Sequence, residues 1–183
     1  MQDYRPARVH MRKRMTIRKT LLAVMLAGLV SMGARASTIE TLYQSSAGND
    51  MGKLKRQVEE LATLAKAEID AHGIKAAMTV FRNPPWRRDA NGLHLWGVSN
   101  AGLAWFHAGH PELERLVVSE MSDLNGLSWP QLALASANNS GEKTFEITFP
   151  HPVLKRAAKS LHQCFPIKDS DRVLCAGAYV DSE

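Results

Sequence analysis

The hydrophobic pattern of this chain changes its period near Gly92, and that change limits the fold more than any other feature. Over residues 51–72 (MGKLKRQVEELATLAKAEIDAH) the apolar positions recur every three or four residues, at Leu54, Val58, Leu61, Ala65 and Ile69. This spacing predicts an amphipathic helix of about six turns, capped by Asn49 or Asp50 and broken at Gly73. From Gly92 onward the apolar residues alternate, with many β-branched and aromatic side chains. Alternation of this kind predicts strands.

The remaining elements follow from the same pattern and from turn residues. A second short helix is predicted over residues 74–81, and the loop after it begins at Asn83-Pro84-Pro85 because residues before proline avoid the helical region. Strands over 93–98 and 103–107 form a hairpin with its turn at 99–102. After an irregular stretch, a helix over 128–137 with Ser128 as its cap precedes three strands over 144–149, 159–165 and 172–180. The fold class predicted is therefore α+β.

The N-terminal segment predicts export. Arg18 and Lys19 precede an uncharged apolar run over residues 21–32, and small residues around Ala34 and Ala36 stand before Ser37. This is the arrangement of a secretory signal peptide over residues 1–36, with a start at Met15 equally compatible. Twelve apolar residues fall short of the roughly 20 that span a bilayer. We therefore expect cleavage after Ala36, a periplasmic or secreted protein without a membrane span, a linker over 37–50 and one domain over 51–183.

Charge and motifs exclude several function classes. The whole chain has a net charge of +5, but eight of its 23 basic residues and one of its 18 acidic residues lie within 1–36. The mature chain is slightly acidic, so its charge does not indicate a nucleic-acid partner. No GxSxG, HExxH, P-loop or paired-carboxylate motif occurs. We expect no enzyme activity, no catalytic residue and no cofactor.

The two cysteines, Cys164 and Cys175, predict a disulfide bond. In an oxidising compartment a pair of cysteines is first interpreted as a crosslink, and ten intervening residues differ from the short spacing of zinc or thioredoxin-like sites. If the two face each other in an antiparallel hairpin, paired residue numbers add to 339 and the turn centres on Asp169-Ser170. The crosslink would then join the last two strands.

From Leu54 to Tyr179 the chain resembles the single Cache domain, a PAS-like extracytoplasmic sensor domain. LHLWGVSNAGLAWFHAGHP is similar to the aromatic strand, turn glycine and second strand of that family, SDLNG to its Asp and Gly loop, FEITFPHP to its third strand and AGAYV to its closing strand. Lys159 matches the lysine that opens the fourth strand. The resemblance implies a five-stranded antiparallel sheet, with the long helix on one side and a small-ligand pocket on the other.

The same resemblance implies a set of ligand-binding residues. These are His94, Trp96, His107, Lys159 and Tyr179 on the strands, with Trp86 as a lid. Arg88 is a further candidate cation. A cation and imidazole donors suit a small anion such as a carboxylate, so we expect a small-molecule ligand of this kind. A domain of this type would pass its state to a membrane kinase, chemoreceptor or transporter.

Two other functions stay open at this stage. The family's third-strand Tyr and Trp appear here as Ile147 and Phe149, and its fourth-strand Tyr is missing near Leu161 and His162, which favours a structural or interaction module with a closed pocket. A metal-binding module is the third hypothesis, and the histidines that suggest it are His94, His107, His110, His151 and His162. HAGH is a single ligand-like spacing without a second pair, so no metal site is predicted.

Overall fold

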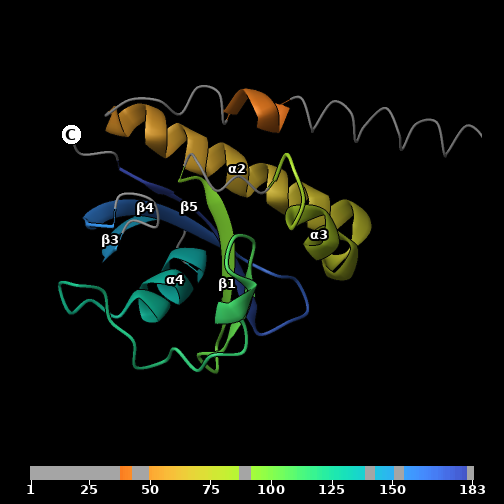
Figure 1. Cartoon of the computed structure of the whole chain (residues 1–183). Coiled ribbons are helices and arrows are strands. Elements are labelled where there is room, and N and C mark those ends of the chain that lie inside the picture. The colour runs from red at the N-terminus through yellow and green to blue at the C-terminus, as the bar shows by residue number, and fades with distance from the viewer. Residues whose placement is uncertain (1–37, 43–49, 87–91, 139–142, 151–154, 181–183) are drawn as a thin grey trace, which may run out of the picture. The chain divides into compact units, whose positions relative to one another are not determined.

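The computed structural model describes residues 38–42, 50–86, 92–138, 143–150 and 155–180 (Figure 1). The predicted signal peptide over residues 1–36 lies outside these described residues. Within the described part of the chain, no helix combines the length and the apolar character needed to cross a membrane.

The long helix forms where the 3.6-residue pattern predicts it. Helix α2 spans Met51–His72, and the Asp50 carboxylate caps it by accepting hydrogen bonds from the backbone N–H of Gly52 at 2.8 Å and of Lys53 at 3.1 Å. Its predicted apolar face is buried, with Ile69 partly so. Gly73, with φ of 78°, ends α2 because this left-handed backbone region favours glycine. Helix α3, Ile74–Phe81, follows directly.

All five predicted strands are present in one sheet. They are β1 (His94–Ser99), β2 (Ala104–His107), β3 (Thr144–Pro150), β4 (Ala157–Pro166) and β5 (Arg172–Tyr179). The strand order is β2-β1-β5-β4-β3, and every pair of neighbours is antiparallel. This is the PAS-like α+β architecture that the sequence predicts.

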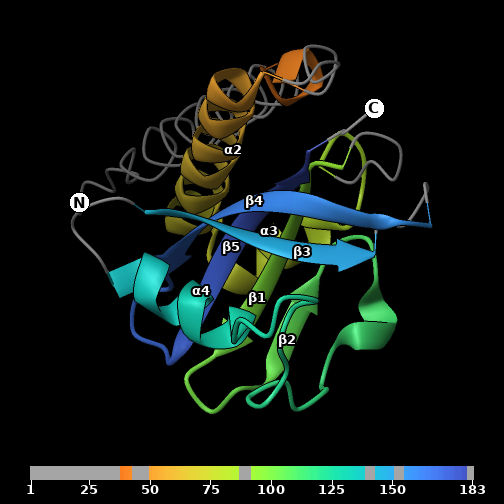
Figure 2. The same ribbon diagram turned by 90° about the vertical axis from the view of Figure 1, so that its left-hand side faces the viewer.

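Helices cover the two faces of the sheet differently. Helix α2 packs on β4 and β5 from one side, whereas α4 (Trp129–Asn138) packs on β3 and β4 from the other (Figures 1 and 2). The face under α2 and α3 buries the larger core, which includes Leu95, Phe106, Leu161, Phe165 and Leu174. The face under α4 buries a smaller core with Trp96, Val98, Ala133, Val173 and both cysteines. Because side chains alternate along a strand, each strand serves both cores.

The predicted linker over residues 37–50 is wrong in part, because residues 38–42 form a helical turn. Ile39 is fully buried in the core under α2, and Leu42 is 7% exposed. The backbone carbonyl of Leu42 accepts a hydrogen bond from the Gln57 side chain at 3.1 Å. Two apolar residues three positions apart are enough to anchor one turn, although the surrounding sequence is polar.

The long segment between β2 and α4 covers both edges of the sheet. Residues 115–118 run beside β2, where the N–H of Arg115 donates to the carbonyl of Ala104 at 2.6 Å and the N–H of Val118 to that of Gly102 at 2.7 Å. At the opposite edge, the Asp123 carboxylate accepts a hydrogen bond from the N–H of Thr148 on β3 at 2.9 Å. Covering its edges protects a sheet from pairing with other chains.

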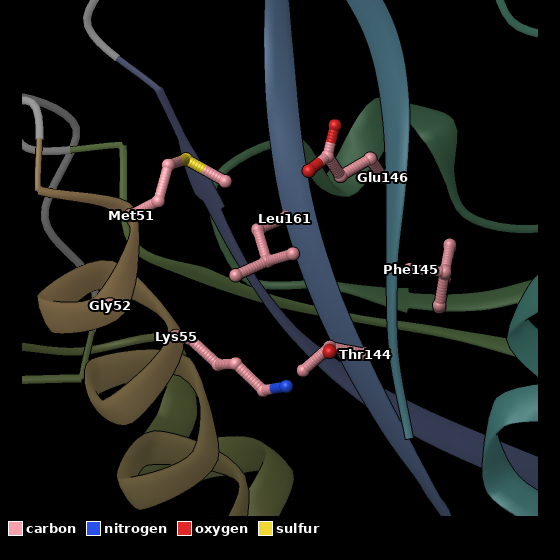
Figure 3. Close-up of a pocket in the computed structure, with 7 residues that line it drawn as sticks. All are labelled: Met51, Gly52, Lys55, Thr144, Phe145, Glu146 and Leu161. Carbon is pink, nitrogen blue, oxygen red and sulfur yellow. The ribbon is translucent and has the colours of Figure 1, made fainter. Parts of the chain in front are cut away.

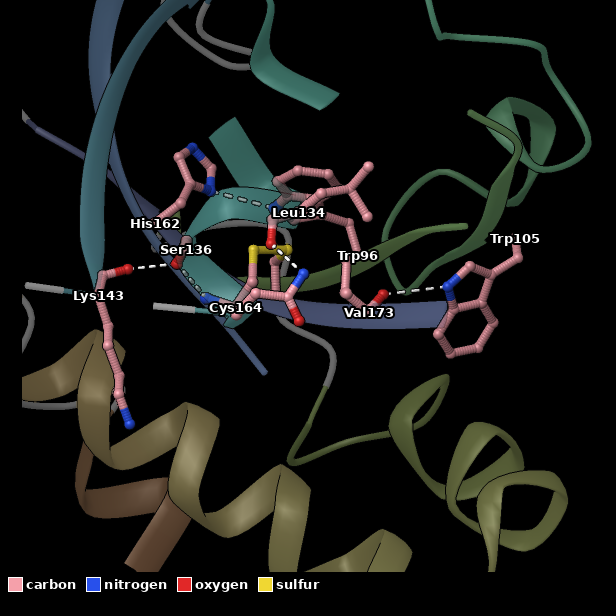
Figure 4. The surroundings of a disulfide bond; sticks show 10 residues. Trp96, Trp105, Leu134, Ser136, Lys143, His162, Cys164 and Val173 are labelled. Carbon is pink, nitrogen blue, oxygen red and sulfur yellow. Dashed lines mark hydrogen bonds between the residues drawn. A yellow bond between two sulfur atoms is a disulfide. The ribbon is translucent and has the colours of Figure 1, made fainter. Parts of the chain in front are cut away.

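Helix α4 begins at Trp129, one residue after the start of the predicted range, and its predicted cap, Ser128, does not cap it through its side chain. The backbone carbonyl of Ser128 accepts from the N–H of Leu132 at 3.1 Å, while its buried hydroxyl has no hydrogen-bond partner among the described residues. Ser136 instead ties the helix to the sheet. Its hydroxyl donates to the carbonyl of Lys143 and accepts from the N–H of Cys164 at 3.1 Å (Figure 4).

Candidate functional site

Four of the predicted ligand-binding residues lie on one face of the sheet, the face that α4 partly covers. The His94 ring stacks on the His107 ring with centroids 5.6 Å apart and on the Tyr179 ring at 5.8 Å. We call His94, His107 and Tyr179 the ring cluster. Each of the three is half-buried. His107 lies on β2, His94 on β1 and Tyr179 on β5, and these strands are adjacent in the sheet. Trp96 lies next to them on β1 and is 6% exposed.

A fifth residue, His162, joins this face. His162 on β4 lies 5.7 Å from His94 and 5.6 Å from Trp96, ring centre to ring centre. The position of His162 could be predicted from the sequence. In the register where paired residue numbers add to 339, Gly177 lies opposite His162 and Tyr179 opposite Ser160. Gly177 has no side chain, and the space that its Cβ would take holds the His162 imidazole.

His162 is held in a complete chain of hydrogen bonds. The Trp96 indole N–H donates to Nδ1 of His162 at 3.0 Å. Nε2 of His162 therefore carries the proton and donates to the Ser160 hydroxyl at 2.8 Å, which donates to the carbonyl of Ile147 at 3.3 Å. Burial, with smaller contributions from His94 and His107, holds the pKa of His162 well below its usual value. This imidazole is neutral, and both of its nitrogens are hydrogen-bonded, so it packs beside the ring cluster and holds its position there.

The two cluster histidines differ from His162 because one ring nitrogen of each is left for a ligand. Nδ1 of His94 donates to the carbonyl of Gly92 at 2.7 Å, so its Nε2 is an acceptor. Nδ1 of His107 accepts from the N–H of His110 at 3.0 Å, so its Nε2 carries the proton and is a donor. Among the described residues neither Nε2 has a hydrogen-bond partner. The cluster thus presents one acceptor and one donor.

Burial keeps both cluster histidines neutral at pH 7. It lowers the pKa of His94, against a smaller raising effect of the hydrogen bond to Gly92. Burial, followed by the nearby His94 and His110, lowers the pKa of His107 to about 3. Burial also raises the pKa of Tyr179, so its phenol keeps its proton. The ring cluster is a neutral polar surface and contains no fixed cation.

Lys159 is not part of this arrangement. It shares the α2 face of β4 with Leu161, two residues on, and its side chain is 68% exposed. Its ammonium group lies 3.5 Å from the Glu146 carboxylate on β3. The prediction that Lys159 faces the same pocket as His94 is wrong, because residues of odd and even number on β4 face opposite sides of the sheet.

Trp86 is not a lid. It is 3% exposed and packs in the core under α2 and α3, with its ring 4.6 Å from the Phe81 ring. The resemblance implied a lid at this position, but the chain after α3 buries the indole in the core. The other loop candidate, Arg88, lies outside the described residues, as does His151 of the metal hypothesis.

Metal ligation finds no support within the described residues, where no group of three or more His, Cys, Asp or Glu side chains is arranged to hold an ion. The rings of His94 and His107 stack face to face instead of pointing their nitrogens at one centre. His110 hydrogen-bonds the exposed carboxylate of Glu112 at 2.8 Å.

One cavity lies on the other face of the sheet. It has a volume of about 420 Å³ and lies between the first turn of α2 and strands β3 and β4 (Figure 3). Its lining residues are Met51, Gly52, Lys55, Thr144, Phe145, Glu146 and Leu161. It contains one basic and one acidic side chain, and the Glu146 carboxylate is already near Lys159. This cavity is separate from the ring cluster.

The predicted disulfide bond is present. Cys164 and Cys175 are directly opposite each other on β4 and β5, with Cα atoms 3.9 Å apart, and both are buried under α4 (Figure 4). The register is the predicted one, in which paired residue numbers add to 339. Trp96 on β1 lies opposite Cys175 on β5, so the crosslink fixes the part of the sheet that lies beside the ring cluster.

Comparison with known proteins supports the fold. No family model and no curated protein matches this chain. A solved structure of a methyl-accepting chemotaxis protein from Vibrio parahaemolyticus superposes with a TM-score of 0.51 at 18% identity, over 91% of this chain and 96% of that one.

Two further solved structures are less similar. A periplasmic sensor domain of a chemotaxis protein gives a TM-score of 0.49 at 15% identity, over 82% of this chain and 98% of that one. A Cache chemosensory domain, described for carboxylic acid recognition, gives a TM-score of 0.46 at 16% identity, over 78% of this chain and 98% of that one. The strand order, the helix positions and the first of these structures define the class of fold, a PAS-like α+β fold with one five-stranded antiparallel sheet, which this chain shares with that chemotaxis protein.

Proposed function

We propose that this chain is an exported, non-enzymatic sensor domain of the Cache type that binds a small molecule at the ring cluster. The observation that supports this most is the gathering of His94, His107 and Tyr179, three half-buried polar rings, on the face that the fold leaves partly free of α4. Half-buried polar rings, two of them histidines with one ring nitrogen unbonded among the described residues, suit a ligand better than a core.

The two free ring nitrogens define the chemistry of the ligand. A carboxylate needs hydrogen-bond donors, and His107 offers one at Nε2, whereas Nε2 of His94 is an acceptor while neutral. A small carboxylic acid fits if it binds together with one proton, held between its oxygen and Nε2 of His94. Lys159 is not needed for this arrangement. We therefore propose a small carboxylate whose affinity rises as the pH falls.

A thermal-shift screen tests this function. Carboxylates, amino acids, purines and divalent metals are added at pH 6 and at pH 7.5, and a ligand that binds only the folded state raises the melting temperature. For a carboxylate that binds, His94→Ala should weaken the affinity by about tenfold or more, which corresponds to one lost charge-assisted hydrogen bond.

Lys159→Ala is the matched control, because its side chain lies on the other face of the sheet. It should leave the affinity unchanged. If Lys159→Ala abolished binding and His94→Ala did not, the ligand would bind at the α2 face near the cavity, and the ring cluster would not be the site.

We also propose that the mature chain acts in the periplasm or outside the cell and passes its ligand state to a membrane kinase, chemoreceptor or transporter. The predicted signal peptide supports this location. A neighbouring gene that encodes such a membrane protein would support the proposed signalling partner. An intact segment 1–36 on the exported chain would contradict the predicted cleavage.

The second candidate is a structural or interaction module with a closed pocket. Trp96 and His162 are almost fully buried, and their hydrogen-bond chain fills the part of this face that lies under α4. If no compound of any class raises the melting temperature at either pH, this candidate replaces the sensor.

A further inference from the structure

Two neighbouring side chains at the start of α4 carry buried polar atoms without a hydrogen-bond partner. The indole nitrogen of Trp129 and the hydroxyl oxygen of Ser128 are closed to solvent, and neither has a partner among the described residues. Both groups can donate a hydrogen bond. Most buried polar groups in folded proteins are paired, because an unpaired one costs free energy. Trp129 and Ser128 are therefore candidates for contact with a ligand.

Trp129 differs from two other tryptophans of the structure. The indole N–H of Trp96 donates to Nδ1 of His162, and that of Trp105 donates to the carbonyl of Val173, both at 3.0 Å. An indole N–H is a donor and never an acceptor. The group that suits Trp129 is therefore an acceptor, such as a ketone, hydroxyl or carboxylate oxygen.

Trp129 lies on the face of the sheet that carries the ring cluster. Its ring makes edge-to-face contacts with Trp96 on β1, at 5.2 Å between centroids, and with Phe149 on β3, at 6.1 Å. Strands β1 and β3 stand on either side of the pair β5 and β4, so Trp129 lies over these middle strands. His162 on β4 and Tyr179 on β5 project from the same face and contact His94. Trp129 and the ring cluster thus border one region.

Helix α4 is bonded to the sheet through its C-terminal half. The Ser136 hydroxyl donates to the carbonyl of Lys143 and accepts from the N–H of Cys164 (Figure 4). At the start of the helix, the Ser128 hydroxyl and the Trp129 indole N–H make no hydrogen bond within the described part of the chain. A small shift of this end therefore breaks no hydrogen bond of these two side chains, and it opens the Trp129 N–H to an acceptor.

We propose that the indole N–H of Trp129 binds a second oxygen of the small carboxylate held at the ring cluster. This role rests on the proposed function and names the second functional group of the ligand. That group is a ketone or hydroxyl oxygen, because α4 carries no charged residue and the rings that contact Trp129 are neutral. A second carboxylate suits this place less well, since burying a charge without a cation is costly.

Isothermal titration calorimetry with three acids of five carbon atoms tests this role. The probes are valerate, α-ketovalerate and levulinate, which carry no ketone, a ketone beside the carboxylate and a ketone near the far end. We expect at least one keto acid to bind the wild type about five- to tenfold more tightly than valerate, as one hydrogen bond to a buried donor provides. Trp129→Phe keeps an aromatic ring, loses the N–H and should remove this preference.

Trp105→Phe is the matched control, because its indole N–H is bonded to Val173 and its ring belongs to the core under α2 and α3. It should leave the keto-acid preference unchanged and lower the urea midpoint of unfolding, since the Val173 carbonyl loses its donor. Trp129→Phe removes no hydrogen bond and should lower the midpoint less. An equal decrease in the two variants would show that the Trp129 N–H is paired in the folded protein and would overturn the proposal.

The binding results separate this role from the proposed function. Equal affinity of the wild type for all three acids would overturn the role of Trp129, as would a keto-acid preference that persists in Trp129→Phe. If valerate binds and His94→Ala weakens it without any such preference, the ring cluster remains the site and only the role of Trp129 is wrong. If none of the three acids binds, the role of Trp129 is also wrong, and the thermal-shift screen with His94→Ala decides the proposed function.

Discussion

At the scale of single residues, the α4 face of the sheet depends on the missing side chain of Gly177. A Cβ there would lie 2.2 Å from Nδ1 of His162 and 3.1 Å from Cε1 of His94. Gly177→Ala must displace His162 and break its hydrogen bond with Trp96. We expect a loss of about 1–3 kcal/mol in the free energy of unfolding, measured by urea denaturation.

Gly52→Ala is the control for this substitution. Its Cβ would lie 3.2 Å from a side-chain oxygen of Asp50 that can shift, in the first turn of a helix. Equal losses of stability in the two variants would contradict the clash with His162.

The buried histidines make stability depend on pH. The unfolded chain takes up protons near pH 6.5, whereas the pKa of His107 in the folded state is about 3, lowered mainly by burial, and the pKa values of His94 and His162 are also lowered. Between these values the unfolded state binds more protons, so the free energy of unfolding should decrease as the pH falls below about 6.5.

Each histidine that remains neutral contributes a slope of up to about 1.4 kcal/mol per pH unit. His107→Gln should reduce the slope by about the contribution of one proton, as measured by urea unfolding at pH 7.5, 6.0 and 5.0. A slope equal to that of the wild type would show that His107 becomes protonated as easily in the folded state as in the unfolded state.

At the scale of secondary-structure elements, Asp123 joins the segment before α4 to the edge of the sheet. Its carboxylate accepts hydrogen bonds from the backbone N–H groups of Asn125, Leu127 and Thr148 at 2.8, 2.8 and 2.9 Å. Burial would raise the pKa of Asp123, but these hydrogen bonds lower it below its usual value. Its stabilising effect is therefore present above the unfolded pKa and is lost as the pH falls through the folded pKa.

Asp123→Ala leaves these N–H groups without their acceptor. We expect a loss of at least about 2 kcal/mol in the free energy of unfolding, with faster hydrogen exchange at Thr148, Asn125 and Leu127. Exchange at Cys164, on the inner strand β4, is the internal reference. Unchanged exchange at Thr148 would contradict the role of Asp123 as the link to β3.

The disulfide bond stabilises the hairpin of β4 and β5 and lies outside the ring cluster. The pair closes a short loop, with a sequence separation of 11. The double variant Cys164→Ala/Cys175→Ala should therefore lose about 3 kcal/mol or less. Thiol labelling of the denatured, unreduced wild type checks the bond itself, and two reactive thiols would refute it.

At the scale of the whole molecule, the disulfide bond agrees with the predicted export. The disulfide bond requires an oxidising compartment, and the N-terminal segment predicts delivery to one. We expect mass spectrometry of the exported protein to show Ser37 as its first residue. Retention of the apolar run over residues 21–32 would favour a membrane anchor instead.

The sequence by itself determined the main helices and strands of this protein and the register of β4 with β5. The change of period predicted α2 and the strands, and the cysteine pairing predicted how β4 and β5 align, because hydrophobic periodicity and covalent geometry are local properties. The same register places Tyr179 opposite Ser160 and Gly177 opposite His162. The sequence therefore contained the evidence that His162, and not Lys159, shares the ring-cluster face.

Only the tertiary structure decided which polar and aromatic groups become buried. Trp86 lies between prolines and arginines in the sequence, but the turn after α3 directs it into the core. The neutral state of His94 and His107 depends on burial by segments distant in the sequence, as does the hydrogen-bond chain from Trp96 to Ile147. Burial and partner choice are properties of packing between elements, which no local pattern encodes.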